Sequence, residues 1–261
     1  MVLSLQGKTA LVCGASRGIG RAIAQELSAL GATCILLARN EEMLKLATEG
    51  LLQTHGQHHE YRVIDFIDRS SFVNAVNKLA SEKNIDILIN NTGGPAAGPI
   101  TNADPLSFEA AFSQHLICNH ILTQSLIPGM KERGWGRIIN IISTSVRIPI
   151  DYLGVSNTIR AAVASWAKTM SNELAQYGIT VNSLLPGFIS TERLDAVAES
   201  FAGREQISKV QMQERMKNSV PAKRFGLPEE IAAVAAFVAS PAASYLNGIC
   251  IPVDGGRTGS I

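Results

Sequence analysis

The sequence predicts an α/β fold in which helices cover both faces of a doubly wound parallel sheet. Short apolar runs alternate along the chain with longer segments of helical period. Most of these runs are continuous, as expected for parallel strands that are buried on both faces. The 261 residues suit one large domain spanning 1–261, because neither a linker nor an internal repeat divides them.

The predicted strands are apolar runs bounded by turn residues. In chain order they are TALVCG (9–14), TCILLA (33–38), YRVIDF (61–66), DILIN (86–90), GRIINIIS (136–143), ITVNSLLP (179–186) and GICIPVDGG (248–256). Helical patterns lie between them, and the first, GRAIAQELSAL, ends at Gly31, a residue type typical of helix C-termini. Residues 190–228 are polar and long for a connection. They form either a lid over a ligand or a solvated helical pair without a gating role.

Charge and the first residues of the chain limit the classes of partner. A formal net charge of +1 gives no reason to expect nucleic acid or an anionic membrane. The start, MVLSLQGKTALVCG, lacks a basic region followed by a long apolar run. We therefore expect neither a signal peptide nor a membrane span, and a cytoplasmic location.

Cysteine and histidine usage gives little support for a metal site. Cys13, Cys34, Cys118 and Cys250 are far apart without a CxxC pair, and three lie in apolar runs. This pattern favours buried, reduced thiols and no zinc site. The segment HGQHH (55–59) is either a metal ligand cluster or a solvated loop. No carboxylate or thiol follows at ligand spacing, so we expect the loop.

A glycine-rich turn follows the first predicted strand directly. The stretch LVCGASRGIGRAIA places Gly14, Gly18 and Gly20 between that strand and the first helix. Glycines permit a tight turn and let backbone N–H groups approach a pyrophosphate at the helix N-terminus. In this strand–turn–helix context the motif predicts a dinucleotide site, and a merely structural turn is the alternative.

The residues after the second strand indicate which dinucleotide binds. NAD-selective folds usually place a carboxylate here for the ribose 2′-hydroxyl. This chain has Ala38 followed by Arg39, and Arg17 lies within the glycine turn. Two guanidiniums without an acid suit a 2′-phosphate, so we expect NADP(H) rather than NAD(H). The alternative for Arg39 is a surface residue that begins a helix.

A series of motifs over nearly the whole chain resembles the short-chain dehydrogenase/reductase family. They are GASRGIG, VIDFID, NNTGG, GRIINIIS, LLPGFIST and FGLPEEIAAVAAFVASPAASYLNGICIPVDGG. The resemblance is nearest to the β-ketoacyl-ACP reductase-like branch. It implies a Rossmann-type domain, a small carbonyl or alcohol substrate, and a homo-oligomer (tetramer or dimer) formed through the helices that contain FSQHLICNHILTQSL and SNTIRAAVASWAKTM.

The resemblance, together with the two arginines, gives a set of candidate cofactor-binding residues. They are Gly14, Ser16, Arg17, Gly18, Ile19, Gly20, Arg39, Asp65, Phe66, Asn91, Gly93, Arg160, Pro186, Gly187, Ile189 and Thr191. Asp65 and the backbone of Phe66 would contact adenine, and Ile189 and Thr191 would hold the nicotinamide carboxamide.

The catalytic positions depart from the family pattern. Family members use a Ser, Tyr, Lys and Asn tetrad, in which Tyr is the acid or base and Lys holds the nicotinamide ribose. Ser143 matches the serine, but Ser156 stands at the Tyr position, 13 residues later, and Arg160 stands at the Lys position. Counting back from WAKTMSNELAQYGITVNSLLPG gives the same register. His115 occupies the Asn position.

These replacements change the expected chemistry. Arg160 keeps a positive charge and several donors, so cofactor binding should persist, but it does not relay a proton as an ammonium does. Ser156 is a far weaker acid than a tyrosine, and general acid–base help is typically worth ~10²–10⁴ in rate.

Two residues are candidate replacements for the acid. His115 is either a proton donor or a buried histidine with one neutral hydrogen bond. Tyr152 precedes Ser156 by one turn and either approaches the substrate or forms an apolar plug or interface contact. Arg147, in the same loop, either pairs with an anionic substrate or is a solvated charge.

Three functions are compatible with this pattern. The first is an active NADP(H)-dependent oxidoreductase with a rewired proton path, which the intact cofactor turn and Ser143 favour. The second is a catalytically inactive NADP(H)-binding sensor or scaffold, which the missing Tyr favours. The third is a structural subunit that assembles with an active relative.

Overall fold

A computed structural model of the protein, which describes residues 1–259, contains one parallel sheet with the strand order β3-β2-β1-β4-β5-β6-β7. The strands are β1 (Thr9–Cys13), β2 (Thr33–Ala38), β3 (Glu60–Val63), β4 (Ile87–Asn90), β5 (Gly136–Ile141), β6 (Ile179–Pro186) and β7 (Cys250–Val253). The predicted doubly wound sheet is therefore confirmed. β2 and β6 match the predicted ranges residue for residue, whereas β3 and β7 are shorter because only part of each run pairs with its neighbour.

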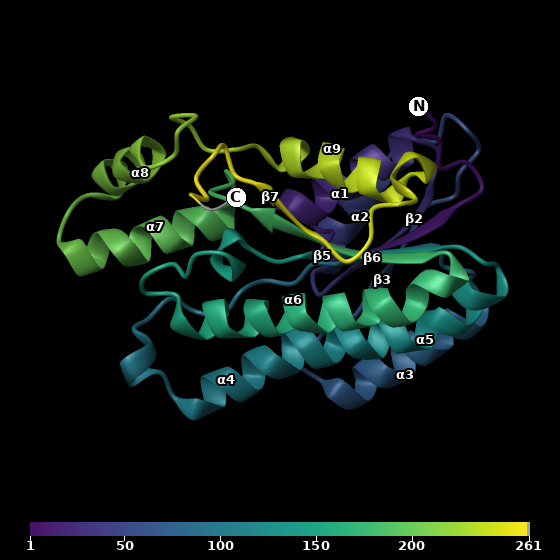
Figure 1. Cartoon of the computed structure of the whole chain (residues 1–261), viewed down its shortest axis with the longest axis horizontal. Helices are drawn as coiled ribbons and strands as arrows, with labels where there is room; N and C mark the ends of the chain where they lie inside the picture. Colours follow the sequence, from purple (N-terminus) through teal and green to yellow (C-terminus); the bar gives the residue numbers. More distant parts are fainter. Residues whose placement is uncertain (260–261) are drawn as a thin grey trace.

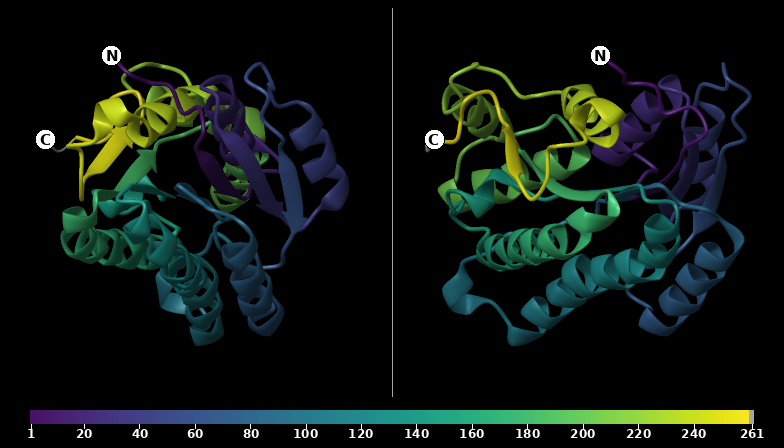
Figure 2. Two further views of the ribbon diagram at one scale, coloured as in Figure 1. Left: turned by 90° about the vertical axis from the view of Figure 1, so that its right-hand side faces the viewer. Right: turned by 45° about the vertical axis from the view of Figure 1, so that its right-hand side comes forward.

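Helices cover both faces of the sheet (Figures 1 and 2). α1 (Gly18–Ala29), α2 (Glu41–Glu49) and α9 (Pro228–Ala239) lie on one face. α3 (Arg69–Glu82), α5 (Cys118–Glu132) and α6 (Gly154–Leu174) lie on the other. Two separate apolar clusters fill these layers. Burial of continuous Val, Ile and Leu runs on both faces is what stabilises a parallel sheet.

The order of the strands fixes where a ligand can bind. The chain starts at β1, builds outward to β3, and then returns to pair β4 with the other edge of β1. The connections that leave β1 and β4 therefore diverge to opposite faces and open a crevice at the carboxyl ends of these strands. The glycine turn follows β1 and the NNTGG segment follows β4, so the two lie side by side.

Residues 190–228 contain two helices that stand apart from the sheet. α7 (Glu192–Glu205) and α8 (Lys209–Asn218) lie at the end of the molecule where α6 begins (Figure 1). Their facing sides form an apolar cluster with the loop before α6. This segment packs on itself and on loops at the carboxyl end of the sheet rather than on the strands, as a movable cover would. Its role as a lid stays a prediction.

Candidate active site

The glycine turn is tightly packed against the segment after β4. Gly14 has φ +59°, and a Cβ there would lie 2.6 Å from the carbonyl oxygen of Asn91. A Cβ on Gly20 would lie 2.3 Å from the carbonyl oxygen of Gly14. Asn91 Nδ2 donates to the carbonyl oxygens of Cys13 and Gly14, at 3.3 and 3.4 Å. These contacts explain why the turn needs glycines and why Asn91 follows β4.

The N-terminus of α1 has the chemistry of a pyrophosphate site. Its N-cap residue, Arg17, makes no side-chain capping hydrogen bond, and the first turn contains no acidic residue. The N–H groups of this turn are thus available to an anion, which the helix dipole also favours. A nicotinamide dinucleotide fits these residues.

The two arginines predicted to bind the 2′-phosphate have different surroundings. Arg39 is exposed after β2, and it makes no ion pair within residues 1–259. Arg17 instead forms an ion pair with Glu192 in the first turn of α7. Asp65 is exposed, and its Oδ1 accepts from the backbone N–H of Ile67 at 3.0 Å. Only Arg39 is therefore ready to receive a phosphate without exchanging a partner.

Replacing Arg39 by alanine is expected to raise the Kd for NADPH about 10–100-fold, since a hydrogen bond to a charged group is worth about 1.5–3 kcal/mol. The Kd for NADH should stay within about twofold, because NADH lacks the 2′-phosphate. Fluorescence titration of both nucleotides measures the effect. Lys45→Ala, which removes an exposed cation of α2, is the matched control. Equal loss of both nucleotides would contradict a 2′-phosphate contact.

Ser156 and Arg160 lie on one face of α6, as their spacing predicts. Arg160 Nε donates to Ser156 Oγ at 3.2 Å. Its Nη1 donates to the carbonyl oxygens of Ile141 and Ile142, at 3.3 and 2.8 Å. Burial and the nearby Arg193 lower the pKa of Arg160 to about 10, so the guanidinium remains charged at neutral pH. These bonds hold a fixed positive charge at the end of β5.

Ser143 lies two residues after the end of β5 and is adjacent in the chain to Ile142, whose carbonyl oxygen accepts from Arg160. Its Oγ accepts from the backbone N–H of Ser145 at 3.1 Å, which caps the short 3₁₀ helix Thr144–Val146. The hydroxyl proton of Ser143 is thus not used in this bond and can be donated to another oxygen. The structure brings Ser156 and Arg160 into contact and places Ser143 next in the chain to the carbonyl group that Arg160 binds.

His115 lies in a π-helical turn, Ser113–Ile117, between α4 (Pro105–Phe112) and α5. Its side chain is buried, and Nδ1 lies 2.5 Å from Thr92 Oγ1. Burial, together with Arg160 and Arg193, lowers the pKa of His115 to about 3. The imidazole is therefore neutral near pH 7. This geometry favours the buried, hydrogen-bonded histidine over the proton donor.

The depressed pKa of His115 makes a prediction about acid stability. In the unfolded chain this histidine binds a proton below about pH 6.5, but in the folded protein only below about pH 3. The unfolded state binds more protons in that window, so the free energy of unfolding falls as the pH falls through it. One proton corresponds to about 1.4 kcal/mol per pH unit.

Between pH 6.5 and 5 the wild type should lose about 2 kcal/mol more than His115→Asn, which has no titrating group at this position. Urea unfolding at the two pH values measures the difference. His58→Asn, which replaces an exposed histidine, should keep the wild-type pH dependence. The same acid loss in His115→Asn would show that other groups cause it.

Tyr152 packs toward α7 rather than toward the serines. Its φ is +65°, its ring meets Phe201 edge to face at 6.1 Å, and the Arg204 guanidinium lies 5.0 Å from the ring centre. Within the described chain its hydroxyl makes no hydrogen bond with Ser143, Ser156 or Arg160. This placement favours the apolar plug over the catalytic acid.

The turn after β6 approaches the same crevice. A Cβ on Gly187 would lie 2.7 Å from Asp254 Cβ, so this position requires glycine. Ile189 forms an isolated parallel bridge with Gly226, and Thr191 caps α7 by accepting from the backbone N–H of Leu194. Thr191 also lies next to the cofactor turn, since a Cβ on Gly18 would be 3.4 Å from its methyl group.

Two residues of this site have no role in the sequence prediction. Thr92 stands where the family's NNAG motif has alanine, and its hydroxyl contacts His115, the residue predicted for the Asn position. The two residues that differ from the family pattern thus contact each other. Their joint difference is the sequence signal that could have identified Thr92 as part of the site. Arg193 reaches back from α7, and its Nη2 donates to the carbonyl oxygen of Pro95 at 2.5 Å. Only the folded chain brings Arg193 beside Arg160.

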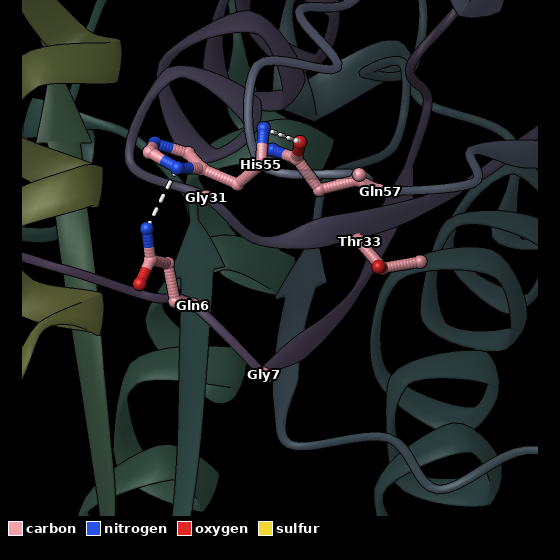
Figure 3. A pocket seen from close by; sticks show the side chains of 7 residues that line it. Gln6, Gly7, Gly31, Thr33, His55 and Gln57 are labelled. Carbon is pink, nitrogen blue, oxygen red and sulfur yellow. Dashed lines mark hydrogen bonds between the residues drawn. The ribbon is translucent and has the colours of Figure 1, made fainter.

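A pocket at the amino ends of β1, β2 and β3 contains no comparable group of side chains (Figure 3). It adjoins the start of β2, and His55 Nδ1 there lies 2.7 Å from Gln6 Nε2. His59 lies nearby, and its Nδ1 accepts from the backbone N–H of Cys34 at 3.0 Å. Within residues 1–259 no group of three potential metal ligands gathers. The thiols of Cys13, Cys34 and Cys118 are buried and unpaired, as predicted.

Comparisons with known proteins agree with this geometry. A family model described as "Enoyl-(Acyl carrier protein) reductase" matches residues 14–258. The NADPH-dependent reductase BacG of Bacillus subtilis is 35% identical over 97% of this chain and 99% of its own. The chain belongs to the short-chain dehydrogenase/reductase family. The 3-oxoacyl-[acyl-carrier-protein] reductase FabG of Aquifex aeolicus is 31% identical over 98% of this chain and 99% of its own.

Solved structures of this family share the fold closely. The NADPH-dependent reductase YwfH, described as involved in bacilysin biosynthesis, has a TM-score of 0.90 at 33% identity, over 97% of this chain and 99% of its own. L-sorbose reductase from Gluconobacter frateurii, solved with NADPH and L-sorbose, has a TM-score of 0.92 at 29% identity, with both chains fully covered. The predicted family and fold are therefore confirmed. In the described part of the chain no helix is long and apolar enough to cross a membrane.

Proposed function

We propose that this short-chain dehydrogenase/reductase reduces a carbonyl compound with NADPH and stabilises the reacting oxygen with Ser143, Ser156 and Arg160. The contact that carries the proposal is the hydrogen bond from Arg160 Nε to Ser156 Oγ. This bond couples the guanidinium and the hydroxyl of the two residues that the sequence register assigns to the Lys and Tyr positions of family members. The charge and the donor are retained, although the acid is weaker.

The hydrogen bonds assign a direction to both hydroxyl groups. Ser156 Oγ accepts from Arg160, and Ser143 Oγ accepts from the N–H of Ser145. Each hydroxyl therefore keeps its own proton for a substrate oxygen. Two such donors beside a fixed guanidinium stabilise the negative charge that develops on a carbonyl oxygen during reduction. When bound, the nicotinamide supplies the hydride.

The final proton reaches the product oxygen from the Ser156 hydroxyl, which water then reprotonates. Arg160 holds its charge throughout, since its pKa of about 10 lies well above neutrality. His115 is neutral and bonded to Thr92, so it stays outside this path. Because a serine hydroxyl is a weak acid, oxyanion stabilisation rather than acid catalysis supplies most of the rate.

The relatives support the cofactor and the reaction. BacG and YwfH are named NADPH-dependent reductases, and L-sorbose reductase was solved with NADPH. Other relatives are named 3-oxoacyl-[acyl-carrier-protein] reductase and gluconate 5-dehydrogenase. We extend NADP(H) and a small carbonyl or alcohol substrate to this chain on that basis. A cytoplasmic location and a homo-oligomer remain predictions.

Binding and turnover of the wild type test this proposal together. NADPH should quench protein fluorescence with a Kd at least about tenfold below that of NADH, as expected for one added charged contact. Absorbance at the NADPH band should then fall with some members of a carbonyl panel. Nucleotide binding without turnover on any carbonyl would support the alternative below, and no nucleotide binding would overturn both.

The alternative is an NADP(H)-binding sensor or scaffold without catalysis. Its support is the packing of Tyr152 against Phe201, which leaves no phenol at the serines. The ion pair between Arg17 and Glu192 suggests how such a sensor would respond to the nucleotide. A nucleotide phosphate would compete with Glu192 for Arg17, and the loss of this ion pair would change how α7 is held.

A further inference from the structure

Two guanidinium groups converge beside the proposed reaction centre. Arg160 comes from α6 and Arg193 from the first turn of α7. Their Nη2 atoms lie 3.2 and 3.1 Å from the point that a Cβ of Gly94 would occupy. Both groups therefore lie within hydrogen-bonding reach of a single anion.

Neither guanidinium has an acidic partner among residues 1–259. Six other arginines do form ion pairs there, namely Arg17, Arg62, Arg133, Arg204, Arg215 and Arg224. Arg193 uses only Nη2, toward Pro95, and Arg160 uses Nε and Nη1. Within the described part of the chain, Arg160 Nη2 and the Nε and Nη1 groups of Arg193 have no hydrogen-bond acceptor. Two unneutralised charges held this close favour binding of an anion between them.

Arg160, one member of the pair, lies apart from the proposed pyrophosphate site, whereas Arg193 follows Glu192, the ion-pair partner of Arg17. A pyrophosphate fits at the first turn of α1, beyond the end of β1, where Arg17 lies. Arg160 instead lies at the end of β5, against the Ile142 carbonyl and Ser156. The free donors thus adjoin the hydroxyl groups that would hold the reacting carbonyl.

We infer that the substrate is a short oxo acid whose carboxylate lies between Arg160 and Arg193 while Ser143 and Ser156 hold its carbonyl oxygen. This inference rests on the proposed reductase function and specifies its substrate class. One guanidinium, that of Arg160, serves both sites: Nε faces Ser156 and Nη2 faces the anion. The carboxylate must therefore lie one or two carbons from the carbonyl. Binding also ties α7 to the substrate through Arg193.

The test compares an acid with its uncharged ester at the same carbonyl. The wild type should reduce 2-oxobutyrate with a higher kcat/KM than methyl 2-oxobutyrate. Arg193→Gln should lower kcat/KM for the acid about 10–100-fold and for the ester less than about threefold, the range expected for one charged hydrogen bond. Arg193→Lys should retain part of the preference. Arg215→Gln, on α8, is the matched control because it removes an exposed arginine outside the site.

A binding measurement keeps the inference separate from turnover. Oxamate, an unreactive oxo-acid analogue, is titrated into the NADPH complex of each variant and followed by nucleotide fluorescence. Oxamate binding that Arg193→Gln weakens, without reduction of any carbonyl, would sink the reductase function and support the anion site. An unchanged oxamate Kd in Arg193→Gln would overturn the inference. The inference would also be overturned if Arg193→Gln lost NADPH affinity by a similar factor while its ratio of kcat/KM for the acid to that for the ester stayed unchanged. Arg193 would then contact a cofactor phosphate.

Discussion

The Ser156→Tyr/Arg160→Lys variant is expected to reduce carbonyl substrates with a kcat about 10²–10⁴ times that of the wild type, the usual contribution of a general acid. The phenol donates a proton far more readily than the serine hydroxyl, and a lysine ammonium relays protons that a guanidinium retains. The rate of NADPH oxidation at saturating carbonyl measures the change. The effect should appear in kcat more than in NADPH affinity, since Lys and Arg can both donate to the ribose hydroxyls.

A tyrosine placed elsewhere on the same helix controls for this substitution. Thr158 is exposed on α6, between the two proposed catalytic positions, and Thr158→Tyr should leave kcat unchanged. An unchanged kcat in the double variant would mean that proton delivery does not limit the rate, and that oxyanion stabilisation by Arg160 already suffices. Turnover by the double variant alone, with a wild type that only binds NADPH, would support the sensor or scaffold.

Gly14→Ala is expected to damage both folding and nucleotide binding. Its φ of +59° is unfavourable for alanine, and the new Cβ would lie 2.6 Å from the Asn91 carbonyl oxygen. Backbone strain of this kind costs about 1–3 kcal/mol in the free energy of unfolding. Because the turn must also shift away from Asn91, the N–H groups of α1 lose their alignment, and the Kd for NADPH should rise at least about tenfold. Urea unfolding and fluorescence titration measure the two effects.

Gly203→Ala is the matched control for this variant. Gly203 lies in α7 with no neighbouring atom within 4 Å of the added Cβ. Alanine there should leave NADPH binding unchanged and raise the free energy of unfolding by up to about 1 kcal/mol, because it favours the helix. Wild-type NADPH affinity in Gly14→Ala would show that the turn does not bind the pyrophosphate as proposed.

Local pattern was sufficient for the fold because each element carries its own signal. The runs 33–38 and 179–186 are continuous and apolar, and they form β2 and β6 over those residues. The same holds for Ser156 and Arg160, since residues four apart in a helix share a face, and Arg160 Nε indeed meets Ser156 Oγ. Spacing along one element fixes such pairs before any tertiary contact forms.

Contacts between distant segments needed the folded chain. Nothing local brings Thr92 to His115, Glu192 to Arg17, or Arg193 to within reach of Arg160. The sequence left two orientations of Tyr152 open, toward the substrate or away from it. In the structure its φ is +65° and its ring contacts Phe201 edge to face, so the side chain lies against α7. The sequence by itself thus determined the family and the glycine-rich turn, and it predicted the altered catalytic register. Only the tertiary structure decided which groups surround that register, because loop conformation and the packing of α7 depend on contacts across the crevice rather than on local period.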